Sequence, residues 1–79
     1  MINNIFFGVS GGLIIDVSTD RDAYLIITRD MKLIHCQPIA PSDSPELCQV
    51  DIVLHYGQVA ISLETKQHDV LDWVDLSIS

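Results

Sequence analysis

The chain has 79 residues, which is too few for two ordinary domains, and 48% of them are hydrophobic, which argues against intrinsic disorder. Eleven acidic residues against four basic ones give a formal net charge of -7. This balance argues against direct binding to nucleic acid or to an anionic membrane, because both need clustered Lys and Arg. We therefore expect one small acidic domain, residues 1–79, whose charge favours a basic protein surface as its partner.

The first half of the chain predicts four short β-strands joined by tight turns, because apolar and β-branched residues alternate between clusters of turn-forming residues. Gly11-Gly12 can supply the positive φ angles of a hairpin turn. The polar segment 18–22 is rich in side chains that bond their own backbone. We expect the four strands to form one antiparallel meander. They are residues 4–9, 13–17, 23–28 and 32–37.

The middle of the chain contains an irregular, proline-containing connection at 38–44, followed by an ambiguous segment. Ser44-Pro45-Glu46 is typical of a helix start, and Gly57 would serve as the stop. Against a helix, apolar and polar residues alternate from Val50 to Tyr56. We expect a strand over 50–56, with one helical turn before it as an open alternative, and then a strand over 59–64.

The last stretch, residues 65–76, predicts an amphipathic helix with Thr65 as its N-cap. At 100° per residue, an apolar arc containing Trp73 faces the sheet and three aspartates face solvent, although Leu76 falls among the acids. We expect Trp73 to be buried. The predicted fold class is α+β, a mostly antiparallel sheet of about six short strands with one C-terminal helix packed on it.

The histidines and cysteines lack the spacing of a metal or catalytic site. His35 and Cys36 are adjacent on a predicted strand and point to opposite faces, and Cys48 and His55 match no zinc pattern. No helix N-terminus or nucleophile elbow is positioned to lower a thiol pKa. We expect no enzyme, no catalytic residue, no metal and no cofactor. The two cysteines are predicted to be free, buried thiols, with a disulfide between them as the alternative.

Two groups of carboxylates are candidates for a partner-binding surface. One group shares a face of the predicted helix at three-residue spacing, where like charges destabilise a helix. A cost without a local structural gain can mark a functional surface, whereas the alternative is a solvated helix face. The second group surrounds the first polar turn. The candidates are Asp69, Asp72 and Asp75 on the helix, and Asp16, Asp20 and Asp22 around the turn.

In size, acidity and lack of motifs, the chain resembles the small phage-encoded inhibitors of bacterial defence, including anti-CRISPR and anti-restriction proteins that imitate DNA. The resemblance is one of class, with no motif in common. It implies a non-enzymatic inhibitor or adaptor whose acidic surface docks on a basic, nucleic-acid-binding partner. The alternative is a small homodimeric assembly or scaffold protein that associates through an apolar sheet face, which the positive mean hydropathy of +0.32 favours.

A cytoplasmic location is expected from the N-terminal residues. No Lys or Arg precedes Arg21, and glycines interrupt the apolar stretch between Ile5 and Ile15. A secretory signal would need a basic region followed by an unbroken apolar one.

Overall fold

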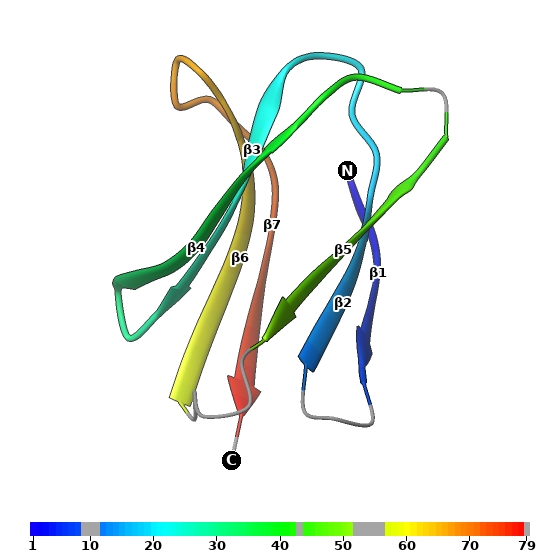
Figure 1. Cartoon of the computed structure of the whole chain (residues 1–79). Coiled ribbons are helices and arrows are strands. Elements are labelled where there is room, and N and C mark those ends of the chain that lie inside the picture. The colour runs from blue at the N-terminus through cyan, green and yellow to red at the C-terminus, as the bar shows by residue number, and fades with distance from the viewer. Residues whose placement is uncertain (9–11, 43, 52–56, 79) are drawn as a thin grey trace.

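The computed structural model describes residues 1–8, 12–42, 44–51 and 57–78, and every regular element in these ranges is a β-strand. The strands form two antiparallel sheets that face each other as a sandwich, with β1-β2-β5 in one sheet and β4-β3-β6-β7 in the other (Figure 1). Their bounds are β1 Ile2–Phe7, β2 Gly12–Val17, β3 Ala23–Arg29, β4 Lys32–Ile39, β5 Glu46–Asp51, β6 Gly57–Thr65 and β7 Val70–Ile78.

The core lies between the two sheets and is filled by every second residue of the strands. This follows from the strand geometry, in which successive side chains point to opposite faces. Each large apolar side chain buried there contributes about 1.5–3 kcal/mol relative to exposure. The buried cluster consists of Leu13, Ile15, Val17, Ala23, Leu25, Ile27, Ile39, Cys48, Val50, Val59, Ile61 and Leu63.

The strand connections differ from the predicted meander. The hairpins β1-β2 and β3-β4 were expected, but β2 and β3 lie in different sheets, and β5 pairs with β2 while β6 pairs with β3. Because β2 and β3 lie in different sheets, the apolar side of each strand is buried in the core between the sheets. In a single four-stranded meander, both apolar sides would lie on the same face of one sheet, with no second sheet to cover them. In immunoglobulin constant domains the strands, lettered in chain order, form the sheets ABED and CFG. With the same lettering, the sheets here are ABE and DCFG, so the two arrangements differ only in the sheet that contains the fourth strand.

The predicted C-terminal helix is wrong, because residues 70–78 form strand β7 at the edge of the four-stranded sheet. Val74 and Leu76 lie opposite Ile61 and Val59 of β6, so they point towards the core. Trp73 points the other way and is 62% exposed. The edge of β6 offers backbone hydrogen-bond partners to a neighbouring strand. The helix prediction considered only the periodicity of the C-terminal segment, so it could not take this pairing into account.

Thr65, the predicted helix N-cap, instead stabilises the turn between β6 and β7. Its Oγ1 accepts a hydrogen bond from the Asp69 amide at 3.1 Å, and its own amide donates to the Asp69 carbonyl oxygen at 2.9 Å. His68 closes the turn with a φ of 66°, a left-handed conformation that His adopts more readily than most residues. The capping prediction therefore identified a real side-chain-to-backbone hydrogen bond in the wrong element.

Strand β5 begins at Glu46, where a helix start had been one alternative. Glu46 pairs with Val17 of β2, so the segment after Pro45 is already extended. Of the strand predicted at 50–56, the first two residues belong to β5, and residues 52–56 lie outside the described part of the chain. Within the described ranges, no helix is long and apolar enough to cross a membrane.

Candidate functional site

The side of the four-stranded sheet that faces away from the core is the candidate functional surface. Strand pairing places Cys36, Ile26, Ser62 and Trp73 in one row across the four strands. Rows on either side complete a surface that we call the Trp73 face. It comprises Tyr24, Ile26, Thr28, Leu33, Cys36, Pro38, Ala60, Ser62, Glu64, Val70, Trp73 and Asp75.

Trp73 is the largest side chain on this face and it is not needed to fill the core. Its side of β7 is exposed, while Asp72 and Val74 on either side of it are partly buried. Its backbone is fixed by pairing with Ser62 of β6. An exposed tryptophan on a hydrogen-bonded strand is therefore presented rigidly to solvent, and tryptophan is one of the residues enriched at protein-binding hot spots.

The charged side chains on the Trp73 face are the carboxylates of Glu64 and Asp75. Glu64 Oε2 accepts a hydrogen bond from the Ser62 hydroxyl at 2.9 Å, and Glu64 Oε1 lies 3.9 Å from Nδ1 of His68 in the adjoining turn. In the described part of the chain, no hydrogen bond or ion pair engages the Asp75 carboxylate. One cation, Lys66, lines a shallow hollow with Tyr24 at the end of the face. The face therefore combines an exposed indole with carboxylates on β6 and β7.

The three aspartates predicted to form one helical row lie in three different places. Asp75 lies on the Trp73 face, and Asp69 is exposed in the turn between β6 and β7. Asp72 is partly buried on the opposite side of β7, where Oδ2 accepts the Ile2 amide and Oδ1 accepts the Trp73 amide, both at 2.9 Å. Asp72 thus joins β7 to β1 of the other sheet, so its role is structural.

The second predicted group is also divided. Asp16 lies on the outer side of the three-stranded sheet between Asn4 and Leu47. Asn4 Nδ2 donates to Asp16 Oδ2 at 3.4 Å, and the buried Oδ1 has no hydrogen-bond partner in the described part of the chain. Asp20 and Asp22, in contrast, lie in the connection between β2 and β3.

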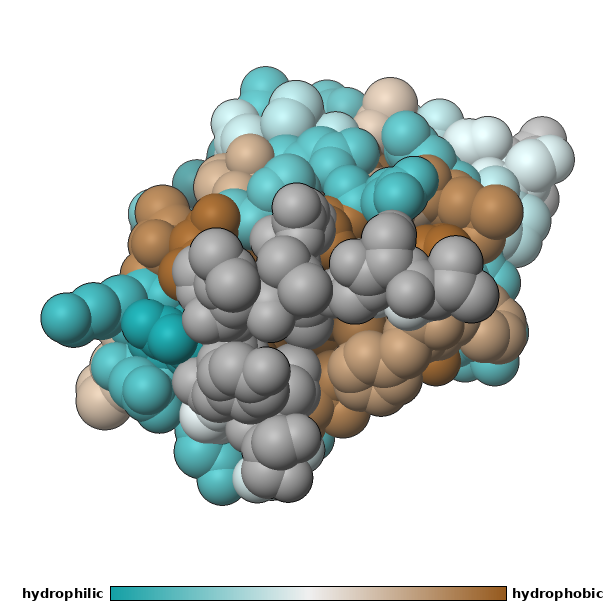
Figure 2. Space-filling model, turned by 60° about the horizontal axis from the view of Figure 1, so that its bottom comes forward, coloured by the Kyte–Doolittle hydropathy of each residue, from teal (hydrophilic) through white to brown (hydrophobic). Residues whose placement is uncertain are grey.

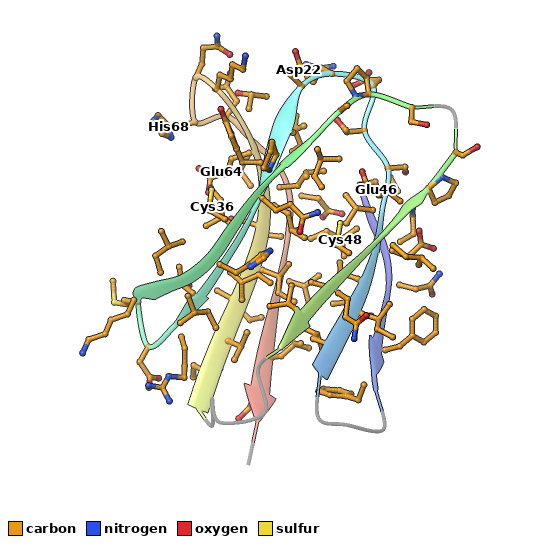
Figure 3. All side chains as sticks on the ribbon, in the orientation of Figure 1. Asp22, Cys36, Glu46, Cys48, Glu64 and His68 are labelled. Atoms are coloured by element: carbon orange, nitrogen blue, oxygen red, sulfur yellow. The ribbon has the colours of Figure 1, made fainter. Side chains whose placement is uncertain are left out.

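Asp20, Asp22 and Asp69 share one end of the sandwich, where basic residues accompany them. Arg21 Nε lies 2.8 Å from Asp20 Oδ1, and this guanidinium lowers the pKa of the Asp20 carboxyl. In turn, the hydrogen bond and charge of Asp20 raise the pKa of the Arg21 guanidinium, and Asp69 adds a smaller effect in the same direction. Figure 3 shows Asp22 and His68 at this same end. Because Arg21 and Lys66 offset the acids here, this end is a weaker candidate for docking than the Trp73 face.

The two cysteines lie in different sheets, Cys36 on β4 and Cys48 on β5. Both are free; Cys48 is buried as predicted, but Cys36 is exposed on the Trp73 face, because its position on β4 points outward (Figure 3). Gln37 Nε2 donates to Cys48 Sγ at 3.6 Å, and its Oε1 lies 3.0 Å from His35 Nε2. Burial raises the pKa of the Cys48 thiol and the nearby Glu46 carboxylate raises it further, so the thiol is neutral and a poor nucleophile. Among the described residues, no three His, Cys, Asp or Glu side chains converge on a metal position.

A second apolar region lies on strand β1, which pairs with β2 at the edge of the three-stranded sheet. Phe6 and Phe7 are both exposed, on opposite sides of β1, and Leu47 is exposed on the outer side of β5. Figure 2 brings one end of the sandwich forward and shows apolar surface beside the grey residues. The chain's one tryptophan lies on the other sheet, so the Trp73 face remains the candidate.

The sequence interpretation missed the Trp73 face because it assigned Trp73 to a helix. The signal that would have found it is the alternation of Val74 and Leu76 with Asp75 and Ser77, which is typical of a half-buried strand and places Trp73 on the polar side.

Comparisons with family models, with curated proteins and with solved structures find no match.

Proposed function

We propose that this chain is a non-enzymatic protein-binding domain, an inhibitor or adaptor, that docks on a basic protein surface through the Trp73 face. The observation that carries the proposal is the 62% exposure of Trp73 on a paired strand, outside the buried cluster. Binding to such a preformed strand orders few side chains, which lowers the entropic cost of association.

The charge of the chain supports a basic partner. A net charge of -7 attracts a positive surface during encounter and raises the association rate. Glu64 and Asp75 extend this negative field onto the Trp73 face itself. The Asp75 carboxylate is exposed and that of Glu64 is partly buried, and carboxylates beside an aromatic anchor are suited to Lys and Arg side chains at the rim of an interface.

A nucleic-acid-binding partner is the narrower form of this proposal, in which the domain imitates DNA as anti-CRISPR and anti-restriction inhibitors do. The acidity of the chain supports it. The row of Asp69, Asp72 and Asp75 proposed to imitate phosphates required a C-terminal helix, and this segment is a strand. In the revised proposal, the carboxylates of the Trp73 face imitate the phosphates instead. This form predicts that double-stranded DNA competes with the domain for the partner.

Homodimerisation through the same face is the second candidate, favoured by the exposed Val70 and Trp73 and by the partly buried Tyr24 and Ile26 beside them. A second copy would bring its own Glu64 and Asp75 to the interface, and like charges at an interface cost several kcal/mol when they face one another. A basic partner avoids this cost, so we rank it first.

Affinity capture with matched variants tests the proposal. Wild-type protein, Trp73→Ala and Phe6→Ala are immobilised separately, and bound proteins are quantified at about 50 mM and about 500 mM salt. We expect a basic protein on the wild type at low salt, strongly reduced by high salt and by Trp73→Ala. Phe6→Ala removes an exposed aromatic from the other sheet and should leave capture unchanged.

Both variants are expected to fold, because exposed substitutions typically shift stability by less than about 0.5 kcal/mol. Capture that survives Trp73→Ala would contradict docking through this face. Absence of any partner, together with a salt-resistant dimer in light scattering that Trp73→Ala dissociates, would establish the homodimer instead.

A further inference from the structure

We infer that Trp73, Asp75 and Glu64 together form a recognition site for an arginine side chain of the partner. The inference rests on the proposed function and deepens it, since it names the chemical group that the partner presents to the Trp73 face.

The register of β6 and β7 places one carboxylate on each side of Trp73 along the sheet. Asp75 follows Trp73 by two residues on the same side of β7, about 6–7 Å along the strand. On β6, Ser62 lies directly opposite Trp73 and Glu64 is its diagonal neighbour. An aromatic ring therefore lies between two carboxylates on adjacent strands.

The neighbours of the indole leave it open. Ser62 and Ala60, which lie opposite Trp73 and Asp75, are too small to cover them. The Asp75 carboxylate has no hydrogen-bond or ion-pair partner in the described part of the chain. By comparison, Asp20 is engaged by Arg21, and both carboxylate oxygens of Asp72 accept backbone amides. Asp75 can therefore pair with a group from outside the molecule.

Arginine matches this arrangement better than lysine. Its planar guanidinium can stack on an indole face while its N–H groups bond a carboxylate in the bidentate geometry that lysine lacks. Lysine can approach either the ring or the carboxylate as a point charge, but it forms no planar contact with both. The combination of the Trp73 ring with Asp75 and Glu64 should therefore bind arginine more tightly than lysine, in addition to attracting both cations.

Peptide titration tests this preference directly. Trp73 is the only tryptophan in the chain, so its fluorescence reports binding at this face. The probes are terminally blocked hexa-arginine and hexa-lysine peptides, which carry equal charge at neutral pH. We expect hexa-arginine to quench Trp73 saturably and to bind about tenfold more tightly than hexa-lysine.

Two variants with the same charge change separate recognition from general attraction. Asp75→Asn should reduce the arginine preference to about twofold, because it removes the bidentate acceptor. Asp22→Asn, at the end of the sandwich, removes the same charge and should leave the preference intact. Trp73→Leu, followed by calorimetry, should also remove the preference while keeping an apolar side chain in place.

Equal affinities for the two peptides would overturn the inference, and so would equal losses in Asp75→Asn and Asp22→Asn. These outcomes are separable from failure of the proposed function. If capture of a basic partner depends on Trp73 while the peptides are not distinguished, the docking face stands and the arginine site is lost. If capture ignores Trp73, docking through this face is itself contradicted.

Discussion

Cys36 and Cys48 show how the side of a strand on which a residue lies decides its chemistry. Cys36 points outward from β4 and is exposed, whereas Cys48 points inward from β5 and is part of the core. Gln37 donates a hydrogen bond to Cys48 Sγ, and burial raises the pKa of the Cys48 thiol. Since only the thiolate reacts readily, burial and the raised pKa of the Cys48 thiol both disfavour reaction at Cys48, whereas Cys36 is accessible.

Alkylation with iodoacetamide followed by mass spectrometry should modify Cys36 at least about 100-fold faster than Cys48, because reaction at Cys48 requires local opening of the sandwich. Cys48 should also make stability depend on pH. Its raised pKa contributes stability that is fully present below about pH 8.5 and is lost as pH rises through the raised value.

Urea unfolding of the wild type and of Cys48→Ala, compared between about pH 7.5 and about pH 10, measures this contribution. The wild type should lose more stability over this range than the variant. Equal losses, or rapid alkylation of Cys48 in the native protein, would contradict the burial of this thiol.

Among the elements, the hairpin β3-β4 carries the clearest local strain. Its two-residue loop, Asp30-Met31, has φ angles of 50° and 69°, the left-handed pair of a type I′ turn. Asp30 Oδ1 accepts the Gln58 amide at 3.3 Å, so this side chain has a structural role. Met31 is 96% exposed and makes no comparable compensation for its conformation.

Met31→Gly should therefore raise stability by about 0.5–1 kcal/mol, because glycine adopts the left-handed conformation without a Cβ clash. Thermal melting compared with the wild type measures the gain, and Met31→Leu, which keeps a Cβ, is the matched control with no expected gain. A lower melting temperature for Met31→Gly would show that the turn is not strained at this residue.

At the scale of the whole molecule, a hydrogen bond to the Asp72 carboxylate joins the two sheets along one side. Asp72 of β7 accepts the amide of Ile2 at the start of β1, and these strands are edges of different sheets. The bond crosses the sandwich outside its apolar core and satisfies an amide that would otherwise be left at an open edge. Hydrogen bonds to charged groups contribute about 1.5–3 kcal/mol.

We expect Asp72→Ala to lower the free energy of unfolding by about 1.5–3 kcal/mol and to speed amide hydrogen exchange at Ile2. Asp75→Ala, three residues along the same strand and on its other side, is the control and should change neither quantity. Unchanged exchange at Ile2 in Asp72→Ala would contradict the bond between the sheets.

Local alternation predicted most of the strands correctly, because a half-buried strand marks its own sequence. In β2, Leu13, Ile15 and Val17 alternate with Asp16 wherever the strand is placed, and the structure confirms their burial. Which strands share a sheet depends instead on pairings between distant residues, such as Leu25 with Leu63, that no local pattern contains.

The C-terminal segment misled the interpretation because its apolar residues satisfy two periods at once. Val70, Leu71, Trp73 and Val74 fit a helical arc, while Val74 and Leu76 fit a strand. The strand prevails because its inward residues complete the core opposite Ile61 and Val59. The candidate site depended on this choice, since only a strand places Trp73 and Asp75 on an outer face.

The position of β3 also sets the order in which the chain can fold. β3 is paired on one side with β4, its neighbour in sequence, and on the other with β6, where Ala23 meets Thr65 and Arg29 meets Val59. Such distant pairings require large loops to close before any contact is gained, so folding should take milliseconds to seconds, in the range of other sandwiches of this kind. During synthesis, β3 has one unpaired edge until β6 has left the ribosome, and this interval is when the nascent chain is most exposed to aggregation.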